Sequence, residues 1–157
     1  MQWVTRERPK IDRIACPWLI RRFIDPEAVI RYVPAGSVRA VAQEDGAIPF
    51  DVPDVELTHR GPLCSFDAFL SKYDLNDPAL HALAHIVRAA DTDTLQQSPQ
   101  APGLLAISLG LGANIKDDHA LLDAGMVVYD ALYTWCRSLS NERHGWDPRQ
   151  LHKEEAS

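Results

Sequence analysis

The sequence lacks the features that would assign a membrane or an oxidising compartment. Its three cysteines, Cys16, Cys64 and Cys136, are far apart and form no C-x-x-C pair. An odd cysteine count without a disulfide framework is typical of a reducing compartment. No run approaches the ~18 apolar residues of a membrane span, and the charged N-terminus has no apolar signal region. We therefore expect a cytoplasmic protein without a membrane partner.

An excess of basic residues is also missing, since the net charge is −6 and the pI about 5.4. A general nucleic-acid binder would need a basic face, so we expect no nucleic-acid partner. The charge is unevenly distributed along the sequence. Residues 1–40 hold 8 of the 16 Lys and Arg but only 4 of the 22 Asp and Glu, so residues 41–157 carry a net charge of −10. One end could attract anions and the other a cation, unless folding interleaves the two surfaces.

The chain has no repeat, low-complexity tract or linker, so we predict one domain over residues 1–140 with a polar tail at 141–157. Apolar patterns and turn residues predict short strands at 2–5, 29–33, 38–42, 47–52 and 55–58. Helices are predicted at 14–24, 66–73, 77–89, 102–111 and 117–139. The fold class is α+β, a small sheet of short strands with one N-terminal helix before a mostly helical C-terminal half. Helix 102–111 is apolar on most sides, which predicts burial.

Cys16 stands beside a proline and among basic residues. Six of these lie within ten positions of it: Arg6, Arg8, Lys10, Arg13, Arg21 and Arg22. If Cys16 is an N-cap with Pro17 as first helical residue, the helix dipole would favour a thiolate and attract an oxyanion. Alternatively, free cysteine is usually a small core residue. Its buried helix side would then be Cys16, Trp18, Leu19, Ile20, Phe23 and Ile24.

Histidines and carboxylates outside the tail form three groups that folding could gather around a metal ion. They are Glu56-x-x-His59, Asp91-x-Asp93 and Asp117-Asp118-His119, from which the candidate ligands are Glu56, His59, Asp91, Asp118 and His119. Glu56 ranks below His59, because residues three apart on a strand point to opposite faces. Nitrogen and oxygen donors favour Fe or Mn, with Zn as a further option. The alternative is that these acids are helix caps and turn residues.

Short pieces along most of the chain carry a resemblance to a known family. They are Trp3-Val4-Thr5-Arg6, Ile11-Asp12-Arg13, Ala15-Cys16, Trp18-Leu19-Ile20, Phe23-Ile24-Asp25, Phe50-Asp51, Thr58-His59, Cys64-Ser65-Phe66, Ala90-Asp91, Asp117-Asp118-His119, Gly125-Met126 and Asp130-Ala131-Leu132-Tyr133. In this order they resemble the C-terminal domain of the chromate-resistance ChrB family. Several members of the family carry a His-Asp-x-Asp run where this chain has Arg88-Ala89-Ala90-Asp91, so this chain keeps only the last acid.

The resemblance implies a bacterial cytoplasmic protein of chromate and oxidative stress. Full-length members have a further N-terminal region for regulation and DNA binding, and chromate systems include a partner with iron superoxide dismutase activity. This chain begins at the C-terminal domain, so we expect a stand-alone domain without the regulatory region.

Three functions are compatible with these residues, and all take a small oxyanion as partner. The first is dismutation of superoxide by a metal at the five candidate ligands. The anion would be attracted by Arg13, Arg22 and Arg60. The second is binding of chromate as a dianion by the same arginines, without turnover. The third is reduction of chromate by a Cys16 thiolate, with Cys64 as the resolving thiol. A homodimer is left open.

Overall fold

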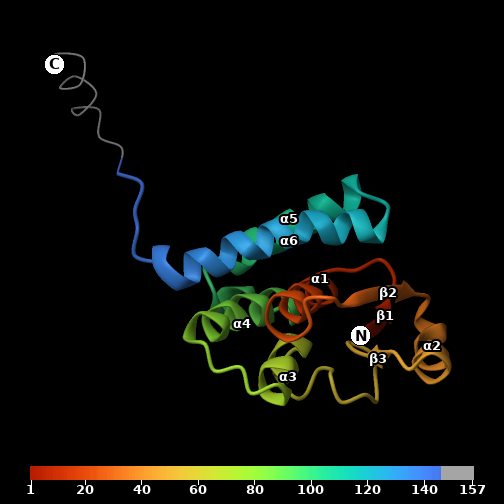
Figure 1. Cartoon of the computed structure of the whole chain (residues 1–157). Coiled ribbons are helices and arrows are strands. Elements are labelled where there is room, and N and C mark those ends of the chain that lie inside the picture. Colours follow the sequence, from red (N-terminus) through yellow and green to blue (C-terminus); the bar gives the residue numbers. More distant parts are fainter. Residues whose placement is uncertain (146–157) are drawn as a thin grey trace, which may run out of the picture.

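The computed structural model describes residues 1–145, and most of the predicted tail, 146–157, lies outside them. In chain order the elements are β1 (Gln2–Arg6), α1 (Asp12–Leu19), β2 (Val29–Val33), α2 (Val38–Asp45), β3 (Ile48–Pro49), α3 (Ser65–Lys72), α4 (Pro78–Asp91), α5 (Ala101–Asn114) and α6 (Asp118–Thr134) (Figure 1). Strand β1 lies between β2 and β3 and is parallel to both, with Val4 opposite Arg31 and Pro49. This arrangement confirms the α+β class, with the sheet first and a helical half after it.

Helix α1 and the π-helical turn Ile20–Ile24 together form the predicted first helix. The helix begins at Asp12, so Cys16 lies in its middle and the predicted N-cap is wrong. Pro17 is also inside the helix, where its missing N–H cannot bond the carbonyl of Arg13. The hydroxyl of Tyr32 donates to that carbonyl at 2.6 Å and replaces the missing hydrogen bond.

Helix α2 replaces the strand predicted at residues 38–42, so that prediction is wrong. The apolar residues Val38, Val41 and Ala42 are spaced as on one helix face, and a short apolar run fits either structure. The helix ends at Gly46, whose φ of +65° is readily adopted by glycine. The strand predicted at 55–58 is reduced to one bridge, between Phe50 and Leu57.

Helices α4 and α6 begin where capping residues predicted them. Asp77 accepts a hydrogen bond from the N–H of Ala79 at the start of α4, and Asp117 does the same for Ala120 in α6. Helix α6 continues as a π-helical segment, Trp135–Leu139. Among the described residues no helix is both long and apolar enough to cross a bilayer.

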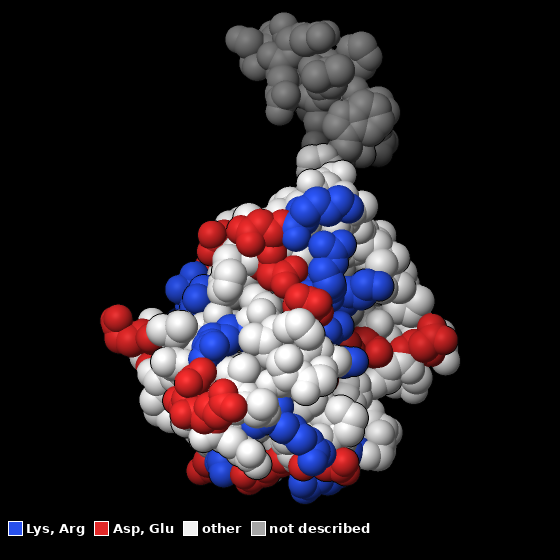
Figure 2. Space-filling model, turned by 90° about the vertical axis from the view of Figure 1, so that its right-hand side faces the viewer, with Lys and Arg blue, Asp and Glu red and all other residues white. Residues whose placement is uncertain are grey.

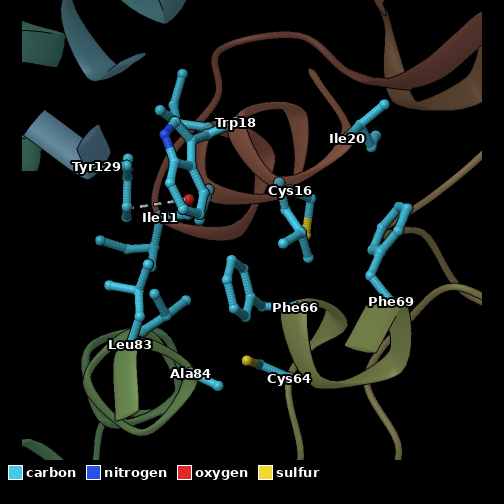
Figure 3. Packing of buried hydrophobic residues seen from close by; sticks show 14 of the residues in the cluster. Ile11, Cys16, Trp18, Ile20, Cys64, Phe66, Phe69, Leu83, Ala84 and Tyr129 are labelled. Carbon is cyan, nitrogen blue, oxygen red and sulfur yellow. Dashed lines mark hydrogen bonds between the residues drawn. The ribbon is translucent and has the colours of Figure 1, made fainter. Parts of the chain in front are cut away.

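The main core lies where α1, α3, α4 and α6 meet (Figure 3). Cys16 and Cys64 are both fully buried there, and burial raises the pKa of each thiol. The buried alternative is therefore confirmed for Cys16, Trp18, Leu19 and Ile20, whereas Phe23 is exposed and Ile24 only half-buried. Gly125 brings α6 close to α1, because a Cβ on this glycine would lie 2.3 Å from Cγ2 of Ile14. This contact fixes α1 against α6.

Helix α5 was predicted to be buried, and this prediction is wrong. It packs against α4 and α6, and only Ala101 and Leu104 are buried. Its apolar composition therefore places only one side of the helix, at Ala101 and Leu104, in the core.

Candidate metal site

Four side chains from separate parts of the fold converge beside the core. Asp12 begins α1, Asp91 ends α4, and Asp51 and His59 lie in the loop between β3 and α3. The Nε2 atom of His59 is 2.9 Å from Asp91 Oδ2, 3.3 Å from Asp51 Oδ1 and 3.4 Å from Asp12 Oδ2. Ligand atoms of Asp12, His59 and Asp91 all lie within 4.8 Å of one another. One metal ion could therefore reach all three side chains.

The N-terminus of α3 holds two of these carboxylates in place. Asp12 accepts hydrogen bonds from the N–H groups of Ser65 at 2.8 Å and Phe66 at 3.4 Å. These amides have no partner within their own helix, and the positive end of its dipole favours an anion. The hydroxyl of Ser65 donates to Asp51 Oδ1 at 2.7 Å. Folding of α3 onto α1 thus determines where Asp12 and Asp51 point.

The half-buried Tyr32 and the buried Tyr129 hold the peptide groups on either side of Asp12. Tyr32 donates to the carbonyl of Arg13, and Tyr129 donates to the carbonyl of Ile11 at 3.4 Å, the bond drawn in Figure 3. Asp12 therefore sits on a backbone that β2 and α6 both restrain.

The cluster places an excess of negative charge away from water. The side chain of Asp12 is 1% exposed and that of Asp91 16%, whereas His59 is 41% exposed. Burial, followed by repulsion from Asp91 and Asp51, raises the pKa of Asp12. Burial and then repulsion from Asp51 raise the pKa of Asp91. A hydrogen bond to Asp51 raises the pKa of His59 in turn. A cation among these carboxylates would relieve the repulsion.

Basic residues approach the cluster on the side of Asp51. Its Oδ2 atom lies 3.6 Å from Nε of Arg13 and 3.8 Å from a terminal nitrogen of Arg6. Burial and the neighbouring Arg6 lower the pKa of Arg13, although its charge remains. Basic and acidic side chains are interleaved on the face shown in Figure 2. The sequence asymmetry in charge therefore does not produce one large basic patch on that face.

The other two predicted oxyanion residues lie elsewhere. Arg22 makes a bidentate pair with Asp130 of α6, with contacts of 3.0 and 2.9 Å. Arg60 lines a separate hollow with Glu56 and Lys72. Of the three arginines, Arg13 alone borders the cluster.

The structure brings together two of the five predicted ligands, His59 and Asp91. Glu56 instead pairs with Lys72 at 2.9 Å. The carboxylate of Asp118 accepts from the N–H of Arg8 at 3.1 Å. The ring of His119 packs edge-on against Tyr32, with centroids 5.5 Å apart. These three candidates lie outside the cluster.

Sequence reasoning missed Asp12 and Asp51. A signal for Asp12 existed, because it precedes Cys16 by four residues and Leu19 by seven, which puts an acid on the buried face of α1. For Asp51 the only signal was its place in the Phe50-Asp51 piece of the family resemblance.

Two comparisons with known proteins found relatives of this chain. A family model described as "ChrB, C-terminal domain" matches residues 3–136. Protein ChrB of Cupriavidus metallidurans is 37% identical over 134 residues, which cover 85% of this chain and 40% of the relative. The chain thus spans less than half the length of that relative, and no solved structure matches it. Since the family model covers the sheet, the helices and the whole carboxylate cluster, the chain belongs to the ChrB C-terminal domain family.

Proposed function

We propose that this domain binds Fe or Mn at Asp12, His59 and Asp91 and acts in the response to chromate and oxidative stress. The observation that supports this most directly is the convergence of three carboxylate oxygens on Nε2 of His59. Oxygen and imidazole donors suit Fe and Mn, and leave Zn as a further option. The chromate role rests on the ChrB family membership.

The donor set is also supported by what surrounds it. Asp12 is fixed by two amides of α3, so its position does not depend on the ion. Asp51 is held by Ser65, and its Oδ1 lies 3.3 Å from the same Nε2 atom, which makes it a further carboxylate that could contact the ion. The thiol of Cys16 is 4.0 Å from Asp12 and fully buried with a raised pKa, so we do not assign it as a ligand or nucleophile.

Superoxide is the substrate we propose, since Fe or Mn would supply one-electron redox chemistry at this place. Arg13 and Arg6 would attract the anion to the Asp51 side of the cluster. The alternative is chromate binding without turnover. It is favoured by Arg6, whose buried Nε atom has no hydrogen-bond partner among the described residues.

Elemental analysis of the full chain, purified without an affinity tag or chelator, tests the metal site. We expect close to one Fe or Mn per chain in the wild type and in His119→Ala. His59→Ala should lose the metal, because it removes the nitrogen donor at the centre of the cluster. His119→Ala is the matched control, since its ring lies outside the cluster. Absence of metal from all three proteins, or equal loss from both variants, would contradict the proposal.

Two assays of the metal-loaded protein then distinguish superoxide dismutation from chromate binding. Superoxide dismutation that is lost in His59→Ala supports the enzymatic function. A melting temperature that rises with chromate, and no longer rises in Arg6→Ala, supports binding without turnover. If protein that contains the metal shows neither response, neither superoxide nor chromate is the ligand of this site.

A further inference from the structure

A second, smaller core lies on the face of the sheet opposite to α1. Trp3 of β1 belongs to the main core. Its neighbour Val4 belongs instead to a cluster with Val38 of α2 and Val52. Since neighbouring residues of a strand point to opposite faces, α1 and α2 cover opposite sides of the sheet. Arg6 follows Val4 by two residues, so its side chain leaves β1 on the side of α2.

Val38 and Val52 also line a hollow of about 410 Å³ at the carboxyl ends of the three parallel strands. Arg6 ends β1, residues 35–36 follow β2 and residues 52–53 follow β3. The chain passes from β1 to β2 at one edge and then back across β1 to β3 at the other. In open parallel sheets, ligands bind at the carboxyl ends of the strands where the strand order reverses in this way. The fold therefore places the hollow where a ligand site is expected.

The wall of the hollow is apolar apart from two arginines. Its lining residues, which define what we call the arginine hollow, are Arg6, Ala35, Gly36, Val38, Arg39, Val52 and Pro53. Among the described residues no acid lines it, although acids outnumber bases in the chain as a whole. A concave and largely apolar surface with two guanidinium groups suits an anion that has an apolar body.

Both guanidinium groups are available to a ligand. The side chain of Arg6 is 41% exposed, and a terminal nitrogen lies 3.8 Å from Asp51 Oδ2, beyond hydrogen-bond distance. Its Nε atom has no hydrogen-bond partner among the described residues. Arg39 contacts Asp54 at 3.1 Å, but the two side chains are 65% and 83% exposed, and an ion pair in water contributes little stability. A bound carboxylate can therefore replace Asp54 at little cost.

We propose that the arginine hollow binds a small organic carboxylate. Its charged group accepts hydrogen bonds from Arg6 and Arg39, because the planar fork of a guanidinium matches the two oxygens of a carboxylate. Its apolar part packs on Val38 and Val52. An inorganic oxyanion has no apolar part to contact these valines, and an uncharged molecule gains nothing from the arginines. The proposed metal ligands do not line the hollow, so this site is separate from the cluster.

Titration calorimetry of the full chain with benzoate tests the proposal. Benzyl alcohol lacks the charge and sulfate lacks the apolar body, so we expect benzoate to bind about tenfold more tightly than either. Arg39→Gln should weaken benzoate binding by about tenfold, because it removes a charge-assisted hydrogen bond. Arg22→Gln is the matched control: it removes an exposed arginine whose ion pair with Asp130 lies outside the hollow, and benzoate should bind it as it binds the wild type.

Folding and the metal site are distinguished by two further measurements. The far-UV circular dichroism of Arg39→Gln should match that of the wild type, since Arg39 is exposed. His59→Ala should bind benzoate normally, and loss of binding in this variant would place the carboxylate on the metal ion and overturn the proposal. Absence of benzoate binding at millimolar concentration, tighter binding of sulfate or benzyl alcohol, or unchanged binding by Arg39→Gln would overturn it as well.

Discussion

The cluster at Asp12 and the exposed face of helix α5 depart from the usual arrangement in opposite ways: the cluster buries charged groups, and α5 exposes apolar ones. In the cluster, three carboxylates gather around one imidazole, and Asp12 is withdrawn from water. On α5, apolar side chains face water on a helix without charge. Each arrangement costs free energy in the isolated chain. A cation would relieve the first, and contact with another apolar surface would relieve the second.

The two regions also differ in how they are tied to the fold. Asp12 is hydrogen-bonded to α3 and held through neighbouring carbonyls by β2 and α6, so changing it alters structure and binding together. The side chains on the outer face of α5 are exposed. Changing them should leave the fold intact.

The largest expected effect on stability is that of Asp12→Ala. The buried N–H groups of Ser65 and Phe66 would lose their acceptor, which should lower the free energy of unfolding by about 2–3 kcal/mol. Asp12→Asn keeps an acceptor oxygen and should be more stable than Asp12→Ala, while it still loses the metal. Urea denaturation together with elemental analysis measures both. If Asp12→Ala is as stable as the wild type, relief of carboxylate repulsion outweighs the two hydrogen bonds.

A pair of glycine substitutions sharpens the contrast between internal and external packing. Gly125→Ala should destabilise the fold by about 1–3 kcal/mol, because its Cβ would overlap Ile14 between α6 and α1. Gly110→Ala has open space around its Cβ and should raise the stability of the monomer by up to about 1 kcal/mol. Thermal melts at low protein concentration compare the two. Equal effects would mean that the surroundings of Gly110 are as closely packed as those of Gly125.

The smallest effect is expected at Asp130, an exposed charge that has its partners within the chain. Hydrogen bonds from Arg22, and then from Trp18, hold the pKa of Asp130 below its ordinary value. Because the folded pKa is lower, this stabilisation is present above the unfolded pKa and is lost as pH falls through the folded pKa. Asp130→Asn should cost less than about 1 kcal/mol at neutral pH, since the pair is half exposed.

Unfolding measured across the acidic range checks the sign of this prediction. The difference in stability between wild type and Asp130→Asn should shrink as pH falls through the folded pKa of Asp130. A difference that grows in acid would show that the carboxylate is not stabilised by Arg22 and Trp18.

Local signals in the sequence determined the class of the fold and much of its order. Asp77-Pro78 and Asp117 begin α4 and α6 where a capping acid predicts a helix start, because a cap acts within a few residues of itself. The buried side of α1 followed from its helical spacing. His59 and Asp91 were found by residue type, and the structure brings these two together.

Tertiary structure alone decided the rest. Asp12 and Asp51 join the cluster because the start of α3 folds onto α1, a contact over more than fifty residues that no local pattern records. Residues 38–42 became helix because their apolar spacing suits both structures and packing selects one. The apolar composition of helix α5 predicts that the helix is covered. Only the three-dimensional arrangement shows that this chain's own core covers little of it.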